Sequence, residues 1–205
     1  TPMRNPSLNV LLIILSAAAA AGEPSAITQT RKALQACAGL RPGMQDNADT
    51  AAQHLADGGA LWAGGNPALV SEFTGRAGGF MMIRPLGDRT PAENDVVLWF
   101  PVDAPPAPES NAVVIPIEPP PATDMPSPTL AAAATGWLFT GELIAALTRL
   151  GKMPVIYESI GAYSGHARIA RFENGAIAWH EEHDVPPVPP GELGNRYVKT
   201  VAAML

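Results

Sequence analysis

The segment SEFTGRAGGFM, residues 71–81, places an acidic and a basic residue four positions apart in front of a pair of glycines. Glu72 and Arg76 have the i, i+4 spacing at which side chains on one helix form an ion pair. A buried glutamate whose pKa is raised toward neutrality can instead act as a general base. The spacing favours the structural pair, which is the commoner outcome, and general-base catalysis by Glu72 is the alternative.

The histidines form a second group of residues that can do chemistry. In WHEEHD, residues 179–184, His180 and His183 stand beside carboxylates and have ligand types that bind zinc. The run lacks the helical His-Glu-x-x-His order, so a solvated turn is favoured, and neither a metal nor another cofactor is expected. His166 follows a predicted strand and is a candidate site residue, with a surface capping role as the alternative.

The overall charge argues against a nucleic-acid partner. The 205 residues include 13 Lys and Arg and 19 Asp and Glu, which gives a net charge of −6 and leaves no basic footprint. The single cysteine, Cys37, excludes an intramolecular disulfide and is expected to be a small core residue. The 22 prolines are about twice the average share and cluster in connecting segments.

The first 26 residues differ from the rest of the chain. Arg4 precedes an apolar run over residues 8–15, and small residues follow, which is the pattern of a secretory signal. This pattern predicts export to the periplasm or outside the cell, and a mature chain without a stable membrane span. The alternative is a first helix that is kept in a cytoplasmic protein. Residues 27–205 are expected to form a single domain.

The remaining chain alternates between helical and strand patterns. Helices are expected at 25–40, 44–59, through Glu72 and Arg76, at 127–151 and at 191–205. Apolar runs at 60–63, 80–86, 95–100, 112–117 and 153–159 predict five buried parallel strands. Asn174-Gly175 predicts a hairpin turn. The expected fold class is α/β, a three-layer α/β/α sandwich with a five-stranded, doubly wound parallel sheet.

Two proline-rich connections stand where crossover helices are expected. They are PVDAPPAPES, residues 101–110, and EPPPATDMPSP, residues 118–128. Ligand sites of such sheets lie at the carboxyl ends of the strands, so these connections are predicted to border the functional rim.

Two segments resemble sugar isomerase (SIS) domains. ALWAGGNPALVSEFTGRAGGFM, residues 60–81, resembles the first strand, loop and helix of small bacterial SIS proteins, and SEFTGR is similar to the Glu-x-x-Gly-Arg segment of phosphoheptose isomerases. LIAALTRLGKMPVIYESIGAYSGHAR, residues 143–168, resembles the family's last long helix, last strand and following glycine-rich loop. The resemblance spans residues 27 to about 170. It implies an SIS-like fold, a homodimer, and a small-molecule sugar or sugar phosphate as ligand.

The resemblance also implies roles for individual residues. Glu72 matches the catalytic glutamate, and Glu142 falls near the family's second catalytic group, a histidine that the helix at 129–150 lacks. His166 is the third catalytic candidate. The candidate ligand-binding residues are Gly64, Gly65, Asn66, Arg76, Asp103, Ser159, Tyr163 and Ser164.

One expected phosphate loop departs from the family pattern. Residues 101–106 contain no side-chain hydroxyl, and the first one that follows is that of Ser110. The Asp103 carboxylate would also repel a phosphate. Two hypotheses therefore stand. The chain is an SIS protein that binds a sugar or phosphosugar and acts as an aldose–ketose isomerase, or it is a non-catalytic SIS-like binding or scaffold module.

Overall fold

The computed structural model describes residues 28, 31–32, 34–37, 41–121, 127–160, 165–181 and 185–204. The signal-like segment 1–26 lies outside these residues, as do Tyr163, Ser164 and His183. The described elements are α3 (Arg41–Ala56), β1 (Leu61–Gly65), α4 (Pro67–Phe73), β2 (Arg84–Pro85), β3 (Val96–Phe100), β4 (Val113–Pro116), α5 (Pro128–Arg149), α6 (Gly165–Glu173) and α7 (Glu192–Met204).

In the described part of the chain four parallel strands form the sheet, in the order β2-β1-β3-β4. All five residues of β3 are buried, as expected for a continuous apolar run at the centre of a parallel sheet. The predicted strands at 60–63, 95–100 and 112–117 are confirmed, and the run 80–86 contributes only the two residues of β2. The α/β class with a parallel sheet is therefore confirmed.

The prediction of a fifth strand at 153–159 is wrong, because this segment does not join the sheet in the described part of the chain. It instead lies between two other segments and forms isolated antiparallel bridges, Phe80 with Ile156 and Pro154 with His180. The backbone N–H of Met81 donates to Val155 at 3.0 Å, and that of Val155 donates to Trp179 at 2.8 Å. Pro154 has no N–H, so this segment cannot form a regular ladder on both sides.

The predicted hairpin at Asn174-Gly175 is also wrong. Residues 165–173 form α6, and Gly175, with φ +75°, ends it. The N–H of Ala176 donates to the Arg171 carbonyl at 2.8 Å, which closes the helix end. A helix end of this kind and a tight hairpin both require positive φ, so an Asn-Gly pair suits either.

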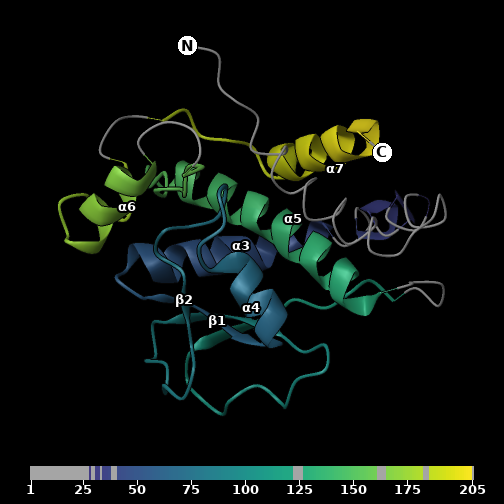
Figure 1. The fold of residues 1–205 in the computed structure, drawn as a ribbon, viewed down its shortest axis with the longest axis horizontal. Helices are drawn as coiled ribbons and strands as arrows, with labels where there is room; N and C mark the ends of the chain where they lie inside the picture. Colours follow the sequence, from purple (N-terminus) through teal and green to yellow (C-terminus); the bar gives the residue numbers. More distant parts are fainter. Residues whose placement is uncertain are drawn as a thin grey trace.

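The helix α5 is the centre of the main hydrophobic core. Ser127, at the predicted start of this helix, caps it by accepting the Leu130 N–H. Figure 1 shows α5 crossing the molecule between the sheet side and α7, and α3, α4 and α7 all contact it. It is long and apolar enough to span a membrane, but most of that stretch is buried inside the fold. The second, smaller cluster contains Leu86, Val97 and Trp99 and, among the described residues, no helix side chain.

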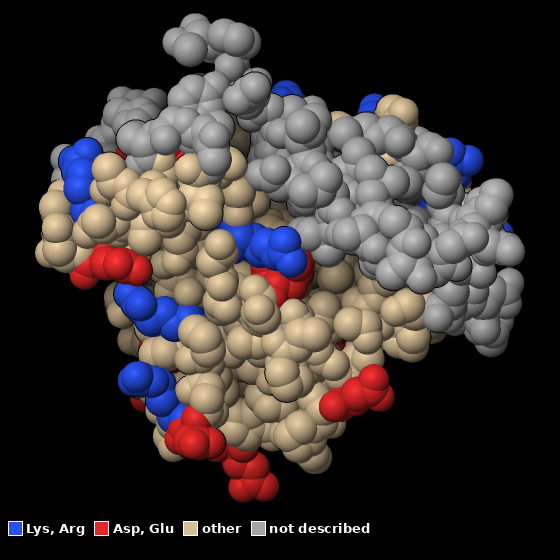
Figure 2. Space-filling view, viewed as in Figure 1, with Lys and Arg blue, Asp and Glu red and all other residues tan. Residues whose placement is uncertain are grey.

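Charge is scattered on the face seen in Figure 2. Described basic and acidic side chains alternate there, and none of the visible described surface forms a large patch of one sign. This face therefore offers no basic surface of the kind that nucleic acid binds.

Candidate functional site

Glu72 lies near the end of α4, the short helix after the first strand. Asn66 starts this helix by accepting the N–H groups of Ala68 and Leu69. The helix ends at Phe73, so the prediction that it continues through Arg76 is wrong. Arg76 nevertheless reaches back from the following turn, and its Nε lies 3.0 Å from Oε2 of Glu72.

The second oxygen of Glu72 has a partner on α5. The indole Nε1 of Trp137 donates to Oε1 at 3.1 Å. Only 7% of the Glu72 side chain is exposed, whereas Arg76 is 49% exposed. The hydrogen bond from Trp137 therefore links Glu72 of α4 to the core helix α5, and the ion-pair partner Arg76 lies half in solvent.

Burial decides the protonation behaviour of Glu72. Desolvation raises the pKa of its carboxyl, and the charge of Arg76 and the hydrogen bonds from Trp137 and Arg76 oppose this without cancelling it. A glutamate with a raised pKa suits proton transfer, but both oxygens of this one already accept hydrogen bonds within the chain.

An aromatic cluster supports the Trp137 indole. The ring of Phe73 lies 4.9 Å from Trp137 and 5.0 Å from Phe100, measured between centroids. Gly136 leaves room for this packing, since a Cβ there would lie 2.4 Å from the Phe73 ring. The position of Glu72 is therefore set by core packing.

A buried polar group lies close to this cluster. Cys37 is fully buried, and its Sγ lies 3.4 Å from the Thr135 hydroxyl on α5. The Tyr197 hydroxyl, from α7, is buried and has no hydrogen-bond partner within the described ranges. Burial and then the nearby Cys37 and Glu72 raise the pKa of Tyr197. Sequence reasoning expected Cys37 in the core but did not link Trp137 or Tyr197 to Glu72.

The first rim loop is engaged in packing. A Cβ on Gly64 would lie 2.7 Å from the Trp99 ring, and one on Gly65 (φ +95°) would lie 2.2 Å from the Phe100 carbonyl oxygen. Asn66, besides capping α4, donates from Nδ2 to the Val102 carbonyl at 3.0 Å. The space that the missing side chains of Gly64 and Gly65 leave is therefore filled by Trp99 and Phe100 of β3, and not left open for a ligand.

The second rim loop contains Asp103 in a left-handed conformation. Its φ is +51°, its side chain is exposed, and the Ala104 N–H closes the turn on the Pro101 carbonyl at 3.2 Å. No helix forms over residues 101–110, as the sequence predicted. An exposed carboxylate thus stands near Val102, where Asn66 joins the two rim loops.

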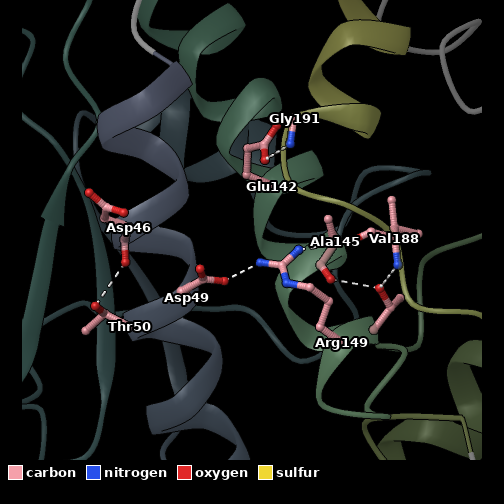
Figure 3. A network of polar contacts seen from close by, with 9 residues as sticks. Asp46, Asp49, Thr50, Glu142, Ala145, Arg149, Val188 and Gly191 are labelled. Carbon is pink, nitrogen blue, oxygen red and sulfur yellow. Dashed lines mark hydrogen bonds and ion pairs between the residues drawn. The ribbon is translucent and has the colours of Figure 1, made fainter.

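Glu142 lies on α5 and faces the chain that leads into α7. Only 2% of it is exposed, and its Oε2 accepts the Gly191 N–H at 2.8 Å (Figure 3). Its Oε1 is buried and has no hydrogen-bond partner in the part of the chain that the structure describes. Glu142 thus contacts the chain just before α7, whereas Glu72 contacts Trp137 and Arg76, so the two glutamates share no hydrogen-bond partner.

Among the candidates after residue 153, only Ser159, His166 and His180 lie in the described part of the chain. Ser159 and His166 are exposed, and the Ser159 carbonyl lies against Gly165 at the start of α6. His180 contacts Lys152, with 3.4 Å between Nε2 and Nζ. The described residues contain no group of three or more His, Cys, Asp or Glu side chains placed to hold a metal.

Two further features were missed by sequence reasoning. Asp95, just before β3, accepts hydrogen bonds from the backbone N–H groups of Ala60 and Ala92 and from the indole N–H of Trp62. An open cavity of about 500 Å³ lies at the amino ends of β3 and β4, opposite to the predicted sugar-binding rim. It is lined by Thr90, Pro91, Glu93, Glu109, Ser110 and Asn111.

Comparison with known proteins adds no family: no protein-family model matches the chain, and no curated protein matches it.

Proposed function

We propose that this chain is a non-catalytic binding module of the SIS type. The observation that carries the proposal is the engagement of both Glu72 oxygens, one by Trp137 and one by Arg76, inside the same chain. A general base needs an oxygen within hydrogen-bond reach of the substrate proton, and the Glu72 side chain is only 7% exposed. Glu72 instead fixes α4 to α5, and the three-layer SIS arrangement, with a shortened sheet, belongs to the same proposal.

The proposed ligand is a sugar without a bound phosphate group. Asn66 uses its side chain to cap α4 and to hold the Val102 carbonyl. Asp103 adds a negative charge to the second rim loop, where a phosphate would be repelled. An uncharged or amino sugar meets neither obstacle. A homodimer and an exported mature chain complete this proposal.

Catalysis as an aldose–ketose isomerase is the second candidate. One observation favours it: burial raises the pKa of the Glu72 carboxyl, and a general base works best when its pKa lies near the working pH. In that mechanism Glu72 moves the proton between adjacent carbons, and His166 or Glu142 supplies the second group. Glu142 is enclosed by Gly191, and His166 is exposed on α6.

A thermal-shift panel separates the two functions. The chain is heated with millimolar sugar phosphates, free sugars, and amino or acidic sugars. A ligand at 100 times its dissociation constant adds about 2.7 kcal/mol, a shift of several degrees at this size. Stabilisation by free or amino sugars alone supports the binding module. Stabilisation by sugar phosphates contradicts the proposed ligand class.

Any stabilising sugar is then tested for isomerisation with the wild type and with Glu72→Gln. Glu173→Gln, an exposed position on α6, is the matched control. Turnover that Glu72→Gln alone abolishes, at unchanged affinity, would establish the isomerase and overturn the proposal. Absence of turnover in all three proteins is the expected result.

A further inference from the structure

The C-terminal arm, residues 185–204, begins with an extended segment whose backbone is hydrogen-bonded to side chains of α5. Its extended part, 185–191, contains Pro186, Pro187, Pro189 and Pro190, so few backbone N–H groups are available. The described hydrogen bonds of Val188 and Gly191 that reach beyond the arm go to side chains of α5. This segment therefore joins neither the sheet nor another strand in the described part of the chain.

Three side chains of α5 make these contacts. The Thr148 hydroxyl accepts the Val188 N–H at 3.0 Å, and Arg149 donates to the Val188 carbonyl at 3.0 Å. Glu142 accepts the Gly191 N–H at 2.8 Å. Figure 3 shows Arg149 between Val188 and Asp49 of α3, with which it forms an ion pair.

The arm then continues as α7, which packs on the core. Val201 is fully buried, and Tyr197 and Val198 pack against the main hydrophobic cluster. Figure 1 shows α7 on the side of α5 away from β1 and β2, and the two helices contact each other. The arm thus covers one side of α5 without contributing to the sheet.

Two buried polar atoms at this interface have no hydrogen-bond partner among the described residues. They are Oε1 of Glu142, beneath the arm, and the hydroxyl of Tyr197, on the arm itself. A buried polar atom without a partner loses its hydration and gains nothing in return. Both atoms recover hydrogen bonds to water if the arm lifts, so the closed position carries a cost that opening removes.

We propose that the C-terminal arm is a strap that opens from α5 as a unit while the sheet, α3 and α5 stay folded. The apolar packing of α7 on the core and three side-chain-to-backbone hydrogen bonds close it, and two unpaired polar groups oppose closure. Segments held in this way open at a lower free energy than the core that they cover. Opening exposes the Glu142 carboxylate and the face of α5 around it.

Hydrogen exchange followed by mass spectrometry tests this strap on the full chain. Amides of residues 188–204 are expected to exchange faster than those of α5 and β3, with a weaker dependence on denaturant. Thr148→Val removes the acceptor of the Val188 N–H and should speed exchange of the arm about fivefold. Tyr197→Phe removes an unpaired buried hydroxyl and should slow it about tenfold.

Thr140→Val is the matched control for Thr148→Val. Both threonines are buried on α5 and donate to a carbonyl of their own helix, but of the two only Thr148 also accepts from the arm. Thr140→Val is therefore expected to leave exchange of the arm unchanged relative to the core. Equal exchange rates and equal denaturant dependence in the arm, α5 and β3 would overturn the proposal. Equal shifts of arm and core exchange in Thr148→Val would do the same.

Discussion

Asp95 provides the sharpest test of how the sheet is held at its amino end. Its carboxylate accepts three N–H groups, from Ala60 at 2.9 Å, Ala92 at 2.9 Å and the Trp62 indole at 2.8 Å. Burial alone raises the pKa of Asp95, but these three donors outweigh burial and lower the pKa overall. The charged form of Asp95 thus stabilises the junction between β1 and β3.

Replacement of Asp95 by Ala removes all three acceptor contacts at once. At about 1 kcal/mol for each partly solvated donor, the loss is about 3 kcal/mol of unfolding free energy. For a chain of this size that loss lowers the Tm by roughly 6–12 °C. Thermal and urea unfolding at pH 7 measure it. Asp95→Asn keeps the shape and one acceptor oxygen, and should lose a smaller part.

The same interaction predicts the pH dependence. Because the pKa of Asp95 is lower in the folded state, the unfolded state binds more protons in the acid range. The stabilisation is complete above the unfolded pKa of about 3.9 and is lost as the pH falls through the folded pKa. The difference in stability between wild type and Asp95→Ala should therefore shrink from pH 6 to pH 3. A difference that stays constant over this range, or a Tm change under about 2 °C at pH 7, would refute the reasoning.

Three further predictions follow from the site and the core. Glu72 has a raised pKa in the folded state, so its contribution to stability should fall as the pH rises from its unfolded pKa through its folded pKa; Glu72→Gln should remove this slope in urea unfolding from pH 4 to 8. Gly136→Ala should destabilise by about 1–3 kcal/mol because its Cβ meets the Phe73 ring, whereas Gly141→Ala on the same helix, with 3.4 Å of clearance, should be neutral or stabilising in thermal unfolding. Asn66→Ala removes a helix cap and should cost about 1–2 kcal/mol by the same measurement, and Asn66→Ser should restore much of this loss.

Local patterns identified the elements that depend on neighbouring residues. The apolar run ending at Phe100 predicted a buried strand, and the helical pattern over residues 127–151 predicted α5 to within two residues at each end. The i, i+4 spacing predicted the ion pair of Glu72 with Arg76, although the helix ends between them. These features follow from periodicity, capping and turn chemistry, which act over a few residues.

Patterns with two physical solutions were misread. The run 153–159 has the composition of a buried strand, but Pro154 prevents a regular ladder and the segment forms isolated antiparallel bridges. Asn174-Gly175 supplies the positive φ that hairpins and helix ends share, and here it follows α6. Which solution forms depends on the partners that the rest of the chain brings.

The sequence by itself determined the α/β class, the central helix, the proline-rich connections and the acidic balance, because composition and short-range pattern carry that information. Only the tertiary structure decided how the candidate residues are used. Glu72 is tied to Trp137, 65 positions away, and Glu142 to Gly191, 49 positions away. Whether a carboxylate is free for chemistry or engaged in the fold depends on its burial and on the donors that distant segments place beside it, and neither can be read from local spacing.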